Sequence, residues 1–327
     1  MKCTNKVRKI IGICMMSVLL LCACGKTEYD MPYDPDYPVS SFRLMNPDTT
    51  TLADSFASGL CVTAENVTEG TDLSLSEIGA AGLFDIHNAE VIYAQNIHEK
   101  LYPASLTKIM TALVALKYGN MDDVLVASEN VIIEEYGAQV FGLEPGDSMT
   151  LNQAMHILLI YSANDVALMI AEHIGGSVVG FSAMMNEEAN AIGATNSHFV
   201  NPHGLSDDNH YTTAYDLYLM FQAAMQYEDF KQIIAMDSYT TVFTNSEGKQ
   251  SEATVKSTNQ YLIKNYTAPE NITVVGGKTG TTNAAGNCLM LLVKDVSGNQ
   301  YIAIIMRAKE RAILYQDMNE LLAEIYE

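Results

Sequence analysis

The stretch Tyr102-Pro103-Ala104-Ser105-Leu106-Thr107-Lys108-Ile109-Met110-Thr111 decides how the rest of this sequence is interpreted. Apolar residues recur there at helical spacing, which predicts a helix from about Ser105 to Tyr118, ended by Gly119. A spacing of three places Ser105 and Lys108 on one helical face, one turn apart. The preceding Pro-Ala pair puts Ser105 at the helix N-terminus, where free amides and the helix dipole favour a developing oxyanion.

Ser105 and Lys108 are a candidate nucleophile and base. A serine hydroxyl is a weak nucleophile and needs a base beside it. Lysine can be that base only when it is neutral, so burial or a neighbouring cation must lower its pKa. The same spacing occurs again in Ser246-Glu247-Gly248-Lys249. Because no apolar helix follows that copy, we interpret it as a solvated loop.

A second motif, Ser162-Ala163-Asn164, lies at a predicted corner between two helices. A hydroxyl at such a corner could relay a proton to a leaving amine. The Asn164 amide could hold a substrate carbonyl or the catalytic lysine. Ser257-Thr258-Asn259 and Ser297-Gly298-Asn299 share the spacing, but the latter is a predicted hairpin turn. Only Ser162 lies at an interhelical corner, so we choose it.

A third motif, Gly276-Gly277-Lys278-Thr279-Gly280-Thr281-Thr282, extends a predicted strand. Glycines along a strand let another backbone approach closely. The charge of Lys278 and the hydroxyl of Thr279 suit a substrate carboxylate. The backbone N–H of Thr281 could point at an acyl oxyanion, and Gly280 lies between these groups.

The remaining pattern predicts an α/β (α+β) fold. Capping-box spacing at Thr150–Gln153 and the cap residues Ser177 and Thr213 mark three helix starts. Strands near both ends of the chain, with helices between them, predict one antiparallel sheet beside a mainly helical lobe at about residues 119–235. The predicted strands are 81–86, 91–94, 272–275, 288–293 and 301–306, followed by a closing helix at 314–326.

Composition limits the function. The chain has 327 residues, of which 48% are hydrophobic and 17% charged, so it is globular and long enough for roughly two domains or lobes. Its formal net charge of −21 argues against nucleic acid and anionic lipid surfaces as partners. Outside the first 24 residues the cysteines are Cys61 and Cys288, which lack paired spacing; two buried thiols are favoured, and a disulfide between them stays open.

The N-terminus is predicted to be an export signal. Basic residues precede a short apolar run that ends in Leu21-Cys22-Ala23-Cys24-Gly25. This order resembles a bacterial lipoprotein lipobox, although an ordinary secretory signal is the alternative. The resemblance implies a signal peptide at 1–23 and a lipidated Cys24 that anchors the protein to the outer face of the bacterial cell membrane. A Pro- and Asp-rich stretch at 24–53 is predicted to be a flexible linker, followed by a catalytic domain at 54–327.

Together the motifs resemble a known family. Ser-x-x-Lys, Ser-x-Asn and Lys-Thr-Gly form the motif set of penicillin-binding proteins. With 199–205 (Phe-Val-Asn-Pro-His-Gly-Leu) and 210–217 (His-Tyr-Thr-Thr-Ala-Tyr-Asp-Leu), they resemble the serine-type D-alanyl-D-alanine carboxypeptidases of peptidase family S11. The resemblance implies a β-lactamase/DD-peptidase-like fold, with a five-stranded antiparallel sheet flanked by helices and no cofactor. The further C-terminal β-rich domain of many relatives is not expected.

The resemblance also implies a two-step acyl transfer. Ser105 attacks the carbonyl between the last two D-alanines of a peptidoglycan stem peptide, and Lys108 takes its proton. Ser162 returns a proton to the departing D-alanine. The N–H groups of Ser105 and Thr281 form the oxyanion hole, and water then hydrolyses the acyl-enzyme. β-Lactams acylate the same serine.

The resemblance also assigns Lys278 with Thr279 to binding the terminal carboxylate of the substrate. A class A-like β-lactamase needs a glutamate soon after the second motif, and the nearest candidate, Glu187-Glu188-Ala189-Asn190, has the wrong spacing. A non-catalytic penicillin- or peptidoglycan-binding protein would be expected to lack a motif residue. No metal is expected, since His203, Asp207, Asp208 and His210 are interpreted as a polar loop.

Overall fold

The computed structural model describes residues 59–68, 73 and 75–326. All of them belong to the second of two units into which the chain divides, Met1–Asp54 and Ser55–Glu327. The predicted signal peptide, Cys24 and the linker lie outside the described residues, so they stay predictions, as does the start of the catalytic domain at 54.

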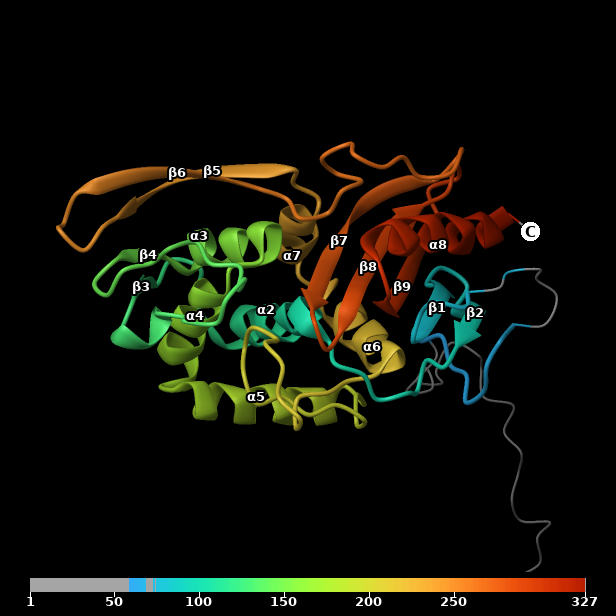
Figure 1. Cartoon of the computed structure of the whole chain (residues 1–327), viewed down its shortest axis with the longest axis horizontal. Coiled ribbons are helices and arrows are strands. Elements are labelled where there is room, and N and C mark those ends of the chain that lie inside the picture. The colour runs from blue at the N-terminus through green and yellow to red at the C-terminus, as the bar shows by residue number, and fades with distance from the viewer. Residues whose placement is uncertain (1–58, 69–72, 74, 327) are drawn as a thin grey trace, which may run out of the picture. The chain divides into compact units, whose positions relative to one another are not determined.

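A five-stranded antiparallel sheet in the order β2-β1-β9-β8-β7 joins the two ends of the described chain (Figure 1). The N-terminal strand β1 pairs with the last strand β9, with Gly82 opposite Ile304. The neighbouring interior strands β8 and β9 are long and mostly buried, as expected for a sheet covered on both faces. This confirms the predicted fold class. The strands are β1 (Ala80–Asp85), β2 (Glu90–Gln95), β7 (Thr273–Thr282), β8 (Gly286–Lys294) and β9 (Gln300–Ala308).

Side chains of the sheet alternate between two hydrophobic cores, because successive residues of a strand point to opposite faces. On β9, Ile304 belongs to the core that contains α2 (Thr107–Tyr118) and α6 (Ala214–Ala224). Its neighbour Ile305 belongs to the core under α8 (Arg311–Ala323). Figure 1 shows α8 lying along β8 and β9.

Helix α2 runs through the middle of the helical lobe. Its residues Thr107–Ala115 are all buried, which is typical of a helix packed on every side. A 3₁₀ turn, η2 (Ala104–Leu106), precedes it. The predicted caps are confirmed: the side chains of Thr150, Ser177 and Thr213 each accept a hydrogen bond from the backbone N–H three residues further on.

The other helices of the lobe are α3 (Leu151–His156), the π-helical turn η4 (Ile157–Tyr161), α4 (Asn164–Gly175), α5 (Val178–Ala191) and α7 (Glu228–Ile234). Among them, α4, α5 and η4 pack against α2, and α3 and α7 pack against η4. Within the described part of the chain, no single helix is long and apolar enough to cross a membrane; α4 and α5, bent by 82°, pass that test only as a pair.

A second sheet makes the prediction of a single sheet wrong. It has the order β3-β4-β5-β6 and consists of β3 (Val124–Val126), β4 (Ser148–Thr150), β5 (Ser238–Thr244) and β6 (Gln250–Lys256). Strands β3 and β4 have three residues each, too few to show a period. Strands β5 and β6 form a mostly solvent-facing hairpin rich in Thr, Ser and Gln, so they lack the apolar alternation of a half-buried strand.

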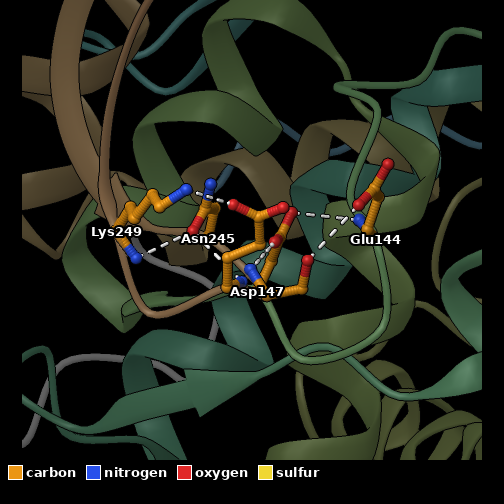
Figure 2. A network of polar contacts seen from close by, with 6 residues as sticks. Glu144, Asp147, Asn245 and Lys249 are labelled. Carbon is orange, nitrogen blue, oxygen red and sulfur yellow. Dashed lines mark hydrogen bonds and ion pairs between the residues drawn. The ribbon is translucent and has the colours of Figure 1, made fainter.

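The tip of the β5–β6 hairpin is tied to the rest of the second sheet through Asp147 (Figure 2). This buried carboxylate accepts hydrogen bonds from the backbone N–H groups of Glu144 (3.0 Å) and Ser246 (2.7 Å). The side chain of Asn245 closes the turn by accepting from the backbone N–H of Lys249 at 2.8 Å. The hairpin is thus held at its tip.

Replacing Asp147 should therefore destabilise the protein. In Asp147→Asn, one amide N–H₂ group must face a backbone N–H donor, which leaves a buried donor unmatched and costs about 1–3 kcal/mol. Glu247→Gln is the matched control. It removes a carboxylate from the same turn, but this carboxylate is exposed and pairs with the exposed Lys249. Urea unfolding should show a lower free energy of unfolding for Asp147→Asn alone. Equal effects of the two variants would contradict the anchoring role.

Candidate active site

The three motifs meet at one pocket of about 650 Å³. They come from three parts of the fold: the start of the α2 segment, the corner between η4 and α4, and strand β7. Two motif residues, Lys108 and Lys278, are 0% and 1% exposed and do not line the pocket themselves. The predicted site residues that do line it are Ser105, Ser162, Asn164, Thr279, Gly280 and Thr281.

The amine of Lys108 is held against the Ser105 hydroxyl. Its Nζ lies 2.9 Å from Ser105 Oγ and donates to Asn164 Oδ1 at 2.6 Å and to the His203 carbonyl at 2.7 Å. These last two oxygens only accept hydrogen bonds. A neutral amine has two N–H groups, and both are used by these acceptors. Its lone pair is then left facing the hydroxyl of Ser105, which is the geometry that a general base requires.

The electrostatic surroundings favour this neutral form. Burial lowers the pKa of Lys108 well below its usual value, and the charge of Lys278 lowers it further, while Asp165 acts in the opposite direction. Burial also lowers the pKa of Lys278, to about 7. Both effects are those by which a lysine becomes a base at neutral pH.

Ser162 lies at the predicted corner between two helices, and its backbone there is strained. Its φ of 69° is left-handed, a region that residues with side chains seldom adopt and that is found mainly where structure over-determines it. The π-helical turn η4 ends immediately before it. Ser162 Oγ accepts a hydrogen bond from Lys278 Nζ at 2.8 Å, so the hydroxyl proton of Ser162 stays available to a group in the pocket.

Strand β7 lies directly against the turn that carries Ser105. A Cβ atom at Gly280 would lie 3.0 Å from the backbone nitrogen of Ser105 and 3.1 Å from that of Leu106. The glycine therefore allows the close approach predicted for this strand. As a result, Ser105 and Thr281 line the same pocket, although their N–H groups as an oxyanion hole stay a prediction.

The predicted carboxylate site differs from the expectation in one respect, because Thr279 lines the pocket and Lys278 does not. Lys278 Nζ donates to Ser162 and, at 2.8 Å, to the Thr279 carbonyl, so its charge lies behind the pocket wall. Thr279 Oγ1 lines the pocket and donates to Thr258 Oγ1 at 2.6 Å. Thr258 was missed, because its motif had been set aside as a second copy of Ser-x-Asn. Lys256 and Arg311 add positive charge to the lining and carry no motif.

Two further copies of the motif spacings, at 246–249 and 297–299, lie outside the pocket lining. Ser246 Oγ donates to Glu144, and Lys249 Nζ pairs with Glu247 at 2.6 Å, so the two residues do not act on each other. Ser297-Gly298-Asn299 is the turn between β8 and β9.

The side chains considered for other chemistry are occupied elsewhere. The candidate β-lactamase stretch 187–190 lies on α5, where Glu188 pairs with Lys117 at 2.6 Å, and neither Glu187 nor Glu188 lines the pocket. Asp208 accepts from the Tyr102 hydroxyl, and His203 Nδ1 accepts from the Leu205 N–H. Among the described residues, no group of three or more His, Cys, Asp or Glu could hold a metal ion. Both folded-domain cysteines, Cys61 and Cys288, are free and buried.

Comparison with known proteins agrees with the geometry. The family model for peptidase S11, described as D-alanyl-D-alanine carboxypeptidase, matches residues 71–310. The chain belongs to this family. Among S11 relatives, the D-alanyl-D-alanine carboxypeptidase DacF of Bacillus subtilis is 35% identical over 246 residues, which is 72% of this chain and 59% of the relative. DacC of Escherichia coli is 31% identical over 252 residues, covering 73% and 59%. The chain thus spans less than two thirds of these relatives.

Solved structures of DD-peptidases share the fold. A D-alanyl-D-alanine carboxypeptidase from Mycobacterium tuberculosis superposes with a TM-score of 0.69 at 25% identity, covering 80% of this chain and 96% of the other. A DD-transpeptidase from Streptomyces gives 0.70 at 22% identity, covering 78% and 98%. These likenesses confirm the DD-peptidase-like fold expected from the motifs.

Removing the charge of Lys278 should raise the pKa of Lys108. A neighbouring cation disfavours protonation, so Lys278→Met shifts the Lys108 pKa upward, towards the usual lysine value. The measurement is an NMR titration of isotope-labelled lysine side chains. The exposed Lys231→Met is the control and should leave Lys108 unchanged. An unchanged or lower Lys108 pKa in Lys278→Met would contradict the coupling of the two amines.

Proposed function

We propose that this protein is a serine D-alanyl-D-alanine carboxypeptidase that removes the terminal D-alanine from peptidoglycan stem pentapeptides. One observation carries the proposal: Ser105 Oγ lies 2.9 Å from a buried Lys108 amine whose N–H groups have two other acceptors. The pocket above this pair is lined by the strand that carries Lys-Thr-Gly. Membership of the S11 family supports the same substrate class.

Acylation begins with proton transfer from Ser105 to Lys108. The serine oxygen attacks the carbonyl carbon of the penultimate D-alanine, and the carbonyl oxygen becomes an oxyanion. The N–H groups of Ser105 and Thr281 stabilise that charge, an interaction typically worth about 10²–10³ in rate for one donor. The positioned base contributes about 10²–10⁴.

Breakdown of the intermediate releases D-alanine. The C–N bond breaks, and the leaving amine takes the proton of Ser162, which Lys278 replaces through its hydrogen bond. A proton then passes from Lys108 to Lys278, so Lys108 is neutral and Lys278 is charged again. Water gives a proton to Lys108 and attacks the ester, and that proton returns to the Ser105 oxygen as it leaves. The terminal carboxylate of the substrate is bound by Thr279, with the positive charge of Lys278 behind it.

The decisive experiment compares wild type with Ser105→Ala, using a fluorescent penicillin and a synthetic D-Ala-D-Ala peptide. Covalent labelling and D-alanine release should both fall to background in the variant, because the nucleophile is gone. Ser246→Ala is the matched control, since it removes the serine of the second Ser-x-x-Lys copy, and it should behave as wild type.

Other outcomes would point elsewhere. Rapid turnover of penicillin would favour a β-lactamase, and no labelling of wild type would favour a non-catalytic binder. Labelling that persists in Ser105→Ala would contradict the proposed nucleophile.

We further propose that the protein is anchored to the outer face of the bacterial cell membrane through a lipid on Cys24. The support is the lipobox-like order Leu21-Cys22-Ala23-Cys24-Gly25 after a basic and apolar segment. The lipid would attach the protein to the membrane at one end. A linker of the composition of residues 24–53 would then let the catalytic domain reach away from the membrane.

Replacing Cys24 tests the anchor. Cys24→Ala should move the protein from the membrane to the soluble fraction, because the only acylated thiol is lost. Cys22→Ala, two residues earlier, is the control and should stay with the membrane. Membrane retention of Cys24→Ala would contradict lipid anchoring at this residue.

A further inference from the structure

The loop at residues 199–211 covers the start of α2 and is joined to it by three hydrogen bonds. Thr111 Oγ1 donates to the Pro202 carbonyl at 2.6 Å, and Lys108 Nζ donates to the His203 carbonyl at 2.7 Å. The third contact joins Thr107 Oγ1 and His210 Nε2 at 2.8 Å. The proposed mechanism uses the second contact but gives no role to the third.

The contacts of His210 settle which ring nitrogen carries the proton. The backbone N–H of Val200 donates to Nδ1 at 3.1 Å, so Nδ1 is unprotonated. The proton of the neutral ring is then on Nε2, which donates to Thr107 Oγ1. The Thr107 hydroxyl in turn donates to the Ala104 carbonyl at 2.8 Å. The hydrogen bonds run in one direction from Val200 to Ala104, and each donor has an acceptor.

This chain of hydrogen bonds is shielded from water. His210 is 1% exposed and Thr107 0%. Burial lowers the pKa of His210 to about 4; among nearby groups Asp207 opposes the shift, and His198 and Lys108 add to it. The ring of Phe199 packs edge-on against the imidazole with centroids 5.5 Å apart. The neutral ring required by the hydrogen bonds is therefore also the form that its surroundings favour.

The series of hydrogen bonds ends at the carbonyl of Ala104, whose backbone has an uncommon conformation. Ala104 has a φ of 47°, in the left-handed region, and directly precedes the nucleophile Ser105. Gly204 packs against its carbonyl so tightly that a Cβ at Gly204 would lie 1.8 Å from the Ala104 oxygen. A strained residue persists where its surroundings over-determine it. Here the Ala104 carbonyl is held by Thr107 on one side and by Gly204 on the other.

We propose that His210 is a positioning residue for acylation: acting through Thr107, it fixes the Ala104 peptide and so aims the N–H and the hydroxyl of Ser105. This inference rests on the function proposed above. It assigns His210 no contact with substrate. Small displacements of a nucleophile are expected to slow the chemical step rather than the initial binding of substrate.

The test uses two variants that differ in one hydroxyl. Thr107→Val removes the hydroxyl and keeps the shape, whereas Thr107→Ser keeps the hydroxyl. Stopped-flow labelling with a fluorescent penicillin separates the dissociation constant of the first complex from the acylation rate constant. We expect Thr107→Val to lower the acylation rate constant about 10- to 100-fold with little change in the first complex, and Thr107→Ser to stay near wild type.

His210→Phe supplies the second half of a double-mutant cycle. It should lower the acylation rate constant to a similar extent, and the double variant with Thr107→Val should show no further loss, because both changes break the same chain. In the wild type, ¹⁵N NMR should show His210 protonated on Nε2 and unprotonated on Nδ1 at neutral pH. Thermal unfolding of each variant distinguishes lost stability from a slower chemical step.

Several results would overturn the inference. One is wild-type acylation by folded Thr107→Val; another is equal loss in the Val and Ser variants; a third is a proton on Nδ1 of His210. If His210→Phe fails to fold, the Thr107 pair and the NMR spectrum still decide. Failure of the proposed function is distinguishable in the wild type alone, which would then either release no D-alanine from the D-Ala-D-Ala peptide or not be acylated at Ser105.

Discussion

The site depends on one buried amine. Lys108 is fully enclosed, and an isolated charge in such a place is costly. Two carbonyl-type oxygens, from Asn164 and His203, take both N–H groups of the neutral form and leave its lone pair facing Ser105. In the proposed mechanism the protein thus obtains a base at neutral pH by withdrawing a lysine from water, with Ser105 as its third neighbour. The α2 turn, the Ser162 corner and the loop at 199–211 all serve to hold this arrangement.

A second amine, that of Lys278, influences the protonation of Lys108. Lys278 donates a hydrogen bond to Ser162, and its charge lowers the pKa of Lys108. When two such groups interact, protonation of one disfavours protonation of the other, so they titrate as a pair. A proton taken from Ser105 by Lys108 therefore makes Lys278 more ready to release one. Ser162 stands between Lys278 and the pocket, which suits it to carry a proton to the leaving group.

Local patterns in the sequence were enough to predict the parts of the site that lie on regular elements. The Ser105–Lys108 turn, the corner at Ser162 and the glycine-rich strand β7 each have a short motif and a recognisable period. The hairpin β5–β6 has neither, because its side chains face solvent. The acceptor at His203 is a backbone carbonyl, which leaves no mark on the sequence. The sequence places His210 in a polar loop, and only the tertiary packing shows that its ring is buried.

Neutron diffraction from a deuterated crystal at neutral pH would test the central claim most directly, because it locates the protons on Lys108. A neutral base requires two deuterons on Nζ, directed at Asn164 and His203, and a deuteron on Ser105 Oγ directed at Nζ. Three deuterons on Nζ, one of them directed at Ser105, would mean that the resting lysine is charged, and would contradict its role as the base that activates the serine.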